Sequence, residues 1–269
     1  MGAPTTIRRG KLRKHDLALV EKDGIFYGRC DSITCAQGTD AELVWRQLRE
    51  NTGKADPRYF GYEGAKTRFL TFFPDRFASA NYPAGEREYK IAAKLKLDAT
   101  APLDRALTEP RLGEAVLSAF RATNLLAPIE KARVQDLLHG SDADAFVHAA
   151  AVFTRDGDAA ALGRLAAVLG PHGCATWTVA TYLPFLWLPE RHMFLKPNVT
   201  KDYAARVGDP FASIYQAPLT FDVYASLLAL VERTERELVA WKPRDRIDIQ
   251  SFIWVVGKYA DKAEEAPVT

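Results

Sequence analysis

The chain has 269 residues, of which 36 are Lys or Arg and 34 are Asp or Glu, so its formal net charge is only +2. With 48% hydrophobic and 26% charged residues, the composition is that of an ordinary globular protein and excludes collagen-like, low-complexity and wholly disordered chains. A chain near 300 residues buries roughly three quarters of its unfolded surface, so this length supports one large domain or two modest ones.

The first 15 residues are interpreted as a flexible basic arm, because five cations fall within seven positions and almost no apolar side chain accompanies them. These cations are Arg8, Arg9, Lys11, Arg13 and Lys14. The basic start is not followed by the apolar stretch and cleavage site of a signal peptide, so we expect a cytoplasmic protein.

A β-hairpin is predicted next, with strands at residues 17–22 and 25–30. The two strands are separated by Asp23 and Gly24, a dipeptide typical of a type I′ turn.

A helix and a third strand are predicted to complete this first region. Thr39 and Glu42 form a capping-box pattern before an amphipathic helix that ends near residues 51–53. Residues 67–73 are rich in β-branched and aromatic side chains and precede Pro74, which together favour a strand. We therefore expect a small antiparallel β-sheet with one helix.

Beyond this region the apolar residues recur with the period of an α-helix. Residues 86–97 predict a helix with Arg87, Lys90 and Lys94 on a solvent-facing cationic side. Further helices are predicted at residues 111–121, 129–138, 142–153 and 158–169.

The last third of the chain is dense in aromatic residues and is predicted to be mostly buried helix. Residues 175–188 form the densest apolar stretch, which is interrupted by polar residues and is shorter than the roughly 20 residues that span a bilayer, so no membrane segment is expected. Thr220 is expected to cap a long amphipathic helix, and the apolar residues 249–256 favour a final helix over a strand.

The predicted fold class is therefore α+β, a small N-terminal antiparallel β-sheet with one helix followed by a larger, mainly helical domain. The predicted divisions are a flexible arm at residues 1–15, an α+β domain at 16–100, a helical domain at 101–258 and a flexible tail at 259–269.

One spacing resembles a nuclease motif. Pro74 and Asp75 precede Glu88 and Lys90 at the spacing of the PD-(D/E)xK pattern, in which two carboxylates hold a divalent metal and a lysine positions the attacking water. The resemblance implies Mg²⁺-dependent phosphodiester hydrolysis with Asp75, Glu88 and Lys90 as catalytic residues. Against it, that family places its second carboxylate and lysine on a strand, whereas this segment has helical periodicity.

The sequence motifs give little support for a metal site, a reactive cysteine or a phosphate-binding cofactor site. Cys30 and Cys35 are close in sequence, but no second Cys or His pair has zinc-ligand spacing, so no metal site is predicted. All three cysteines, including Cys174, are interpreted as small apolar residues of a reducing compartment. Neither phosphate-binding glycine motif is present, so no cofactor is expected apart from Mg²⁺ in the nuclease alternative.

Charge distribution provides the favoured functional hypothesis. Residues 1–100 contain 18 Lys and Arg against 13 Asp and Glu, a net +5, whereas the remainder has a net charge of −3. A basic N-terminal region favours a DNA- or RNA-associated binding or accessory protein that contacts phosphates. The proposed contacts are Arg8, Arg9, Lys11, Arg13, Lys14, Arg87, Lys90 and Lys94.

Two further hypotheses belong to different classes. The tryptophans at 177, 187, 241 and 254 are candidate anchors for a protein partner or a homo-oligomer, which favours a non-catalytic interaction module. Charged residues around 196, 202 and 244–248 are candidates to line a small-molecule pocket, or else Arg246 and Asp248 fix the last helix in place.

Overall fold

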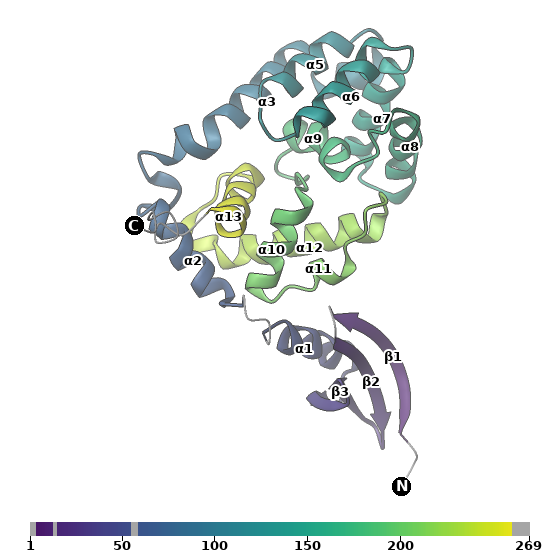
Figure 1. The fold of residues 1–269 in the computed structure, drawn as a ribbon, viewed down its shortest axis with the longest axis vertical. Helices are drawn as coiled ribbons and strands as arrows, with labels where there is room; N and C mark the ends of the chain where they lie inside the picture. Colours follow the sequence, from purple (N-terminus) through teal and green to yellow (C-terminus); the bar gives the residue numbers. More distant parts are fainter. Residues whose placement is uncertain (1–3, 13–14, 55–58, 260–269) are drawn as a thin grey trace, which may run out of the picture. The chain divides into compact units, whose positions relative to one another are not determined.

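The computed structural model describes residues 4–12, 15–54 and 59–259. Four strands precede a succession of helices, which confirms the predicted α+β class (Figure 1). The chain divides into two compact units: unit 1 comprises Met1–Arg68, Val199–Tyr215 and Val256–Thr269, and unit 2 comprises Phe69–Asn198 and Gln216–Val255. The boundary predicted after residue 100 therefore lies within unit 2.

The sheet of unit 1 is an antiparallel meander with the strand order β1-β2-β3-β4. Its strands are Thr5–Leu12, His15–Lys22, Ile25–Cys30 and Ile33–Gly38. The predicted hairpin is β2 with β3, and Asp23 and Gly24 in its turn have φ values of 54° and 79°, as a type I′ turn requires. A second two-residue turn joins β3 to β4, with positive φ at Asp31 (47°) and Ser32 (73°).

Strand β1 corrects the prediction of a flexible basic arm. It pairs with β2 from Thr5 opposite Glu21 to Leu12 opposite His15. Hydrogen bonds to β2 pair one edge of the backbone of this segment, so it is ordered although most of its side chains are exposed and polar. Arg13, Lys14 and the predicted tail beyond Tyr259 lie outside the described residues.

Helix α1 (Ala41–Lys54) covers one face of this sheet (Figure 1). The carboxylate of Asp40 accepts a hydrogen bond from the Leu43 N–H at 2.8 Å, so Asp40 rather than the predicted Thr39 caps the helix. The apolar side of the helix and the sheet share a core of Leu12, Leu17, Leu19, Val44, Trp45 and Leu48.

Helix α2 (Gly61–Phe72) occupies most of the segment that was predicted as a third strand, and that prediction is wrong. Phe69 and Phe73 are four residues apart, so they lie on one side of a helical segment, with ring centroids 5.1 Å apart. Phe69 also contacts the Phe252 ring at 5.2 Å, far away in sequence. Burial of this aromatic side outweighs the local preference of β-branched and aromatic residues for strands.

Unit 2 is helical. It contains the end of α2 and a 3-10 turn, Arg76–Ala78, before a π-helical turn, Pro83–Arg87, which continues into α3 (Glu88–Thr100). The four helices predicted between residues 111 and 169 are confirmed as α5 (Gly113–Arg121), α6 (Pro128–His139), α7 (Ala143–Asp156) and α8 (Ala159–Leu169). The other helices are α4 (Leu103–Thr108), α9 (Trp177–Trp187), α10 (Pro197–Val207), α11 (Phe211–Ile214), α12 (Phe221–Glu237) and α13 (Arg246–Lys258), of which α10 and α11 belong mostly to unit 1.

The centre of unit 2 is α9, in which every residue is buried. Its two tryptophans have their indole N–H groups satisfied internally: Trp177 donates to the Gln216 carbonyl at 2.8 Å and Trp187 to the Ala101 carbonyl at 2.9 Å. Both are therefore core residues rather than exposed anchors for a partner. Across the described ranges, no helix is both long enough and apolar enough to cross a membrane.

Candidate functional site

The face of the sheet opposite α1 carries an ordered arrangement of charged side chains, and we call it the open face. The register places Arg9 opposite Ala18 and Ala18 opposite Arg29, so the three residues form one row across β1, β2 and β3. Successive side chains of a strand point to opposite faces, so this row points away from Leu17 and Leu19, which pack against α1. Two arginines therefore flank a short alanine side chain.

The short side chain of Ala18 leaves a depression between the arginines. This cavity of about 580 Å³ is lined by Arg9 and Arg29, with Asp16, Asp31 and Ser32 among its other lining residues. Neighbouring strands lie about 4.8 Å apart, so the α-carbons of the two arginines are separated by about 10 Å. Two long guanidinium side chains at this separation can reach the same anionic group or two adjacent ones.

The arginines of the open face lack carboxylate partners within the described ranges, whereas the acids there have partners. Arg9 is exposed and forms no ion pair with any described residue. The Arg29 guanidinium donates to the Ser32 carbonyl at 2.7 and 3.2 Å, which orients the side chain without neutralising its charge. Asp16 pairs with Lys11 at 3.5 Å, and Asp31 pairs with His15.

Arg8 lies on the other side of the sheet from Arg9, as the alternation of a strand requires. Its guanidinium stacks over the Trp45 ring at 5.3 Å and forms an ion pair with Glu42 of α1 at 3.1 Å. Of the five cations predicted in the basic arm, the structure thus brings Arg9 and Lys11 to the open face and Arg8 to the helix side.

The predicted solvent-facing cationic side of α3 is not formed. Lys90 is 0% exposed, and its ammonium group donates to Glu86 at 3.2 Å and to Ser251 at 2.9 Å. Lys94 donates to Asp98 at 2.9 Å and to the Trp187 carbonyl at the end of α9 at 3.2 Å. Each of these two cations therefore has one acidic partner four residues away and one partner from a distant part of the sequence.

Arg87, the third of these cations, belongs to a buried ionic network at the start of α13. Its guanidinium forms two hydrogen bonds to Asp245, at 2.6 and 2.7 Å, and a third to Asp248 at 2.9 Å. Asp248, whose side chain is 0% exposed, also accepts from the Tyr82 hydroxyl at 2.7 Å and from three donors of Arg244. These charges hold distant segments together.

The residues of the nuclease pattern are separated by burial. Asp75 and Glu88 are exposed, whereas Lys90 is fully buried and bonded to Glu86. Glu88 and Lys90 are two residues apart on α3 and so project from different sides of the helix. The lysine is therefore not available to position a water molecule beside a metal held by Glu88.

The charged residues near the last helix also have structural partners. Arg246 forms an ion pair with Glu235 at 2.9 Å and donates to the Arg191 carbonyl. Lys196 donates to the Leu125 carbonyl at 2.8 Å. Together with the burial of Asp248, these contacts favour the alternative in which such residues fix α13 and its neighbours in place.

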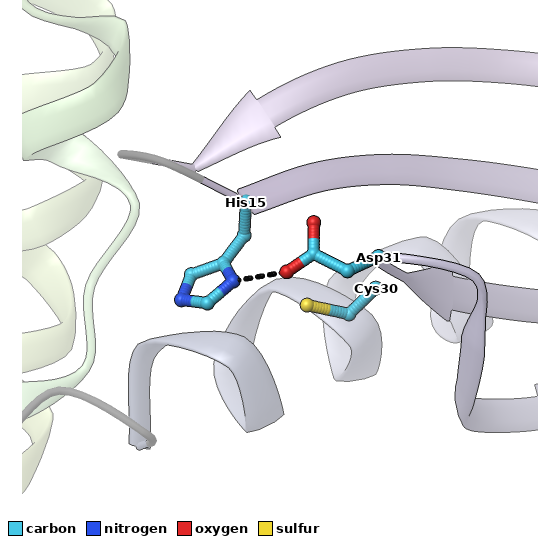
Figure 2. Close-up of side chains that lie close together, drawn as sticks. All are labelled: His15, Cys30 and Asp31. Atoms are coloured by element: carbon cyan, nitrogen blue, oxygen red, sulfur yellow. Dashed lines mark hydrogen bonds and ion pairs between the residues drawn. The ribbon is translucent and has the colours of Figure 1, made fainter.

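A second cluster lies at the end of the sheet where the β3–β4 turn meets the start of β2 (Figure 2). One ligand atom from each of His15, Cys30 and Asp31 lies within 4.8 Å of the other two. The His15 Nδ1 and an Asp31 carboxylate oxygen are 2.5 Å apart. In the described part of the chain, these three residues form a candidate set of metal ligands.

Arg29, His15, Cys30 and Asp31 were not among the site residues predicted from the sequence. The turn at Asp23 and Gly24 fixes the register of the predicted hairpin and places Arg29 opposite Ala18, so this pair was accessible from the sequence. The contribution of Arg9 was not, because β1 was not predicted.

No family model, curated protein or solved structure matches this chain.

Proposed function

We propose that the chain associates with nucleic acid and that the open face of its N-terminal sheet makes the contact. The observation that carries this proposal is the row of Arg9, Ala18 and Arg29, in which two arginines without carboxylate partners in the described residues border one cavity. Guanidinium groups match the geometry of phosphate oxygens and remain charged at all physiological pH values.

Residues of the adjacent rows extend this surface beyond a site for a single small anion. Lys11 follows Arg9 by two positions on β1 and therefore lies on the same face. Tyr27 stands opposite Val20 in the next row and offers a partly exposed ring against which a base can stack. A surface that combines cations in line with an aromatic ring favours an extended polyanion.

The shape of the domain is compatible with this partner. Some proteins bind nucleic acid by placing the strands of a β-sheet against a groove of the duplex. Helix α1 packs against the opposite face of the sheet, so the side chains on the open face remain accessible. Contacts through arginine and phosphate alone give affinity with little sequence selectivity.

The test is binding of fluorescent DNA and RNA duplexes and single strands, measured by anisotropy at several salt concentrations. Arg9→Ala with Arg29→Ala is compared with Arg105→Ala and Arg155→Ala, a double variant that removes the same charge from exposed sites in unit 2. Each lost phosphate contact lowers the slope of log K against log salt by about 0.9 on duplex DNA, so we expect a decrease of about 1.8 for the first variant only.

Two results would contradict the proposal. One is the absence of binding by the unmodified chain to every nucleic acid at low salt. The other is an equal loss of affinity in both double variants, which would assign the effect to total charge rather than to the open face.

A further inference from the structure

The cluster of His15, Cys30 and Asp31 combines three metal-ligating groups from separate parts of the sheet. His15 begins β2, Cys30 ends β3, and Asp31 is the first residue of the turn that follows (Figure 2). Their nitrogen, sulfur and oxygen atoms lie within 4.8 Å of one another. Chance proximity of exposed acids does not explain this cluster, because the imidazole and the thiol are both partly buried.

Backbone hydrogen bonds to Asp16, which follows His15, fix Asp31 in position. The Asp31 N–H donates to the Asp16 carbonyl at 2.9 Å, and the Asp16 N–H donates to the Asp31 carboxylate at 2.8 Å. The second bond engages one carboxylate oxygen, and the other oxygen points to His15. Hydrogen bonds of this kind from neighbouring groups orient ligands in metal sites.

The surroundings of Cys30 do not suit a nucleophilic thiolate. Burial raises the pKa of Cys30, and the charge of Asp31 raises it further, while a hydrogen bond with Thr52 acts in the opposite direction. A free thiol in these surroundings stays protonated at neutral pH, whereas nucleophilic cysteines have lowered pKa values. A bound cation reverses this balance, because it displaces the thiol proton.

We propose that His15, Cys30 and Asp31 bind one divalent transition-metal ion of the Zn²⁺ class. Imidazole nitrogen, thiolate sulfur and carboxylate oxygen are the three ligand types of protein zinc sites, whereas Mg²⁺ and Ca²⁺ prefer oxygen ligands alone. Ion binding releases the thiol proton of Cys30 to solvent. The proton of the hydrogen bond between His15 Nδ1 and Asp31 also leaves Nδ1 by exchange with solvent, and Nε2 carries the one proton of the neutral imidazole. The thiolate and the Asp31 carboxylate then balance the two positive charges, with a neutral His15.

The geometry requires only small movements. Bond lengths of about 2.0–2.3 Å and tetrahedral angles place ligand atoms about 3.3–3.8 Å from one another. The pair of His15 Nδ1 and Asp31 oxygen, now at 2.5 Å, opens by about 1 Å, and any separation near the 4.8 Å limit closes by about the same amount. Side-chain rotation at His15 and Cys30 suffices for such shifts.

Three protein ligands leave a fourth position for water or for an external ligand. The Cys35 thiol lies near enough to Cys30 for a side-chain hydrogen bond that raises the pKa of Cys30, and it also donates to the Ile33 carbonyl at 3.5 Å. Cys35 is not one of the three clustered residues. Cys35 therefore provides a matched control for substitution of Cys30, on the neighbouring strand of the same sheet.

The test is titration of the reduced, chelator-treated full chain with Co²⁺, which reports thiolate ligation through a near-ultraviolet charge-transfer band. We expect one Co²⁺ per chain, displacement by Zn²⁺, and loss of the band in Cys30→Ser but not in Cys35→Ser. His15→Ala and Asp31→Asn are expected to weaken binding by at least the roughly 10- to 100-fold that the loss of an outer-shell partner costs. A band that survives in Cys30→Ser overturns the proposal.

X-ray absorption at the zinc edge of the unmodified chain gives an answer that does not depend on how any variant folds. We expect one sulfur at about 2.3 Å and nitrogen or oxygen ligands at about 2.0–2.1 Å. A shell without sulfur, or one with two or more sulfurs, overturns the assignment of these three ligands.

Discussion

Asp248 is the most connected acid of the buried network in unit 2, and its replacement by asparagine tests how that network is held together. The carboxylate accepts hydrogen bonds from Tyr82, from Arg87 and from three donors of Arg244, all between 2.7 and 3.0 Å. Burial by itself raises the pKa of Asp248, but the hydrogen bonds from Arg244 and Tyr82 and the charge of Arg87 outweigh it, so the pKa is lowered.

Asparagine has nearly the same shape but presents one acceptor oxygen and one NH₂ donor group. In the Asp248→Asn variant, the new NH₂ group would face the donors of Tyr82 and Arg87 or those of Arg244. The negative charge of the buried ion pair with Arg87 would also be lost, together with that of the half-exposed pair with Arg244. Removal of one partner from a buried ion pair costs about 3–5 kcal/mol. At about 2–4 °C per kcal/mol for chains of about 150–250 residues, the expected decrease in Tm is about 6–20 °C.

The assay is urea unfolding followed by tryptophan fluorescence, since Trp177, Trp187, Trp241 and Trp254 all belong to unit 2. Glu109→Gln is the control, because it also removes one carboxylate from an ion pair, but the pair of Arg105 and Glu109 is exposed and screened by solvent. The reasoning would be refuted if Asp248→Asn lowered the free energy of unfolding by less than about 1 kcal/mol, because breaking a buried ion pair costs several times more.

Three further predictions concern pH, packing and the coupling of the two proposals. Burial lowers the pKa of His192 to about 4, so between about pH 6.5 and about pH 4 the unfolded chain binds a proton at this residue that the folded chain does not bind. The free energy of unfolding is therefore expected to decrease by about 3 kcal/mol as the pH falls from about 6.5 to about 4. His192→Asn should make the Tm in thermal melts less dependent on pH over this range. Gly28→Ala places a Cβ 2.9 Å from the Cβ of Leu48 and should lower the free energy of unfolding by about 1–3 kcal/mol. Gly163→Ala in α8 places a Cβ in open space, with no atom within 4 Å beyond its chain neighbours and the backbone of its own helix, and should raise the free energy of unfolding by up to about 1 kcal/mol. Equal effects of the two substitutions in calorimetry would contradict the packing argument. If both proposals hold, Zn²⁺ removes one negative charge beside the Arg9 and Arg29 cavity, so anisotropy should show tighter DNA binding with Zn²⁺ than without it in the unmodified chain and no change in Cys30→Ser.

Elements whose determinants are local were predicted from the sequence. The β2–β3 hairpin follows from Asp23 and Gly24, since a type I′ turn requires positive φ at both positions and these residues tolerate it. The helices between residues 111 and 169 follow from apolar periodicity and from breaks such as Gly157, which ends α7 at a φ of 67°. Such signals depend on neighbours within a few residues.

Elements whose determinants are remote were missed. The basic segment of β1 has no apolar pattern of its own, and it is a strand because β2 supplies its hydrogen-bond partners. The side chains of Arg87 and Lys90 have the spacing of a solvated helix face, but acids and hydroxyls near the start of α13, 161 positions away, bury them. Contacts between residues so far apart in the sequence do not affect the local periodicity of apolar residues.

The two proposed sites divide in the same way. The amino-acid sequence by itself determined that the first hundred residues carry the positive charge, and through the Asp23-Gly24 turn it determined that Arg29 stands opposite Ala18. Only the tertiary structure decided that Arg9 completes this row and that His15 meets Cys30 and Asp31. The physical reason is that strand pairing is a contact between separate segments, and its register, not the order of residues along one segment, sets which side chains share a face.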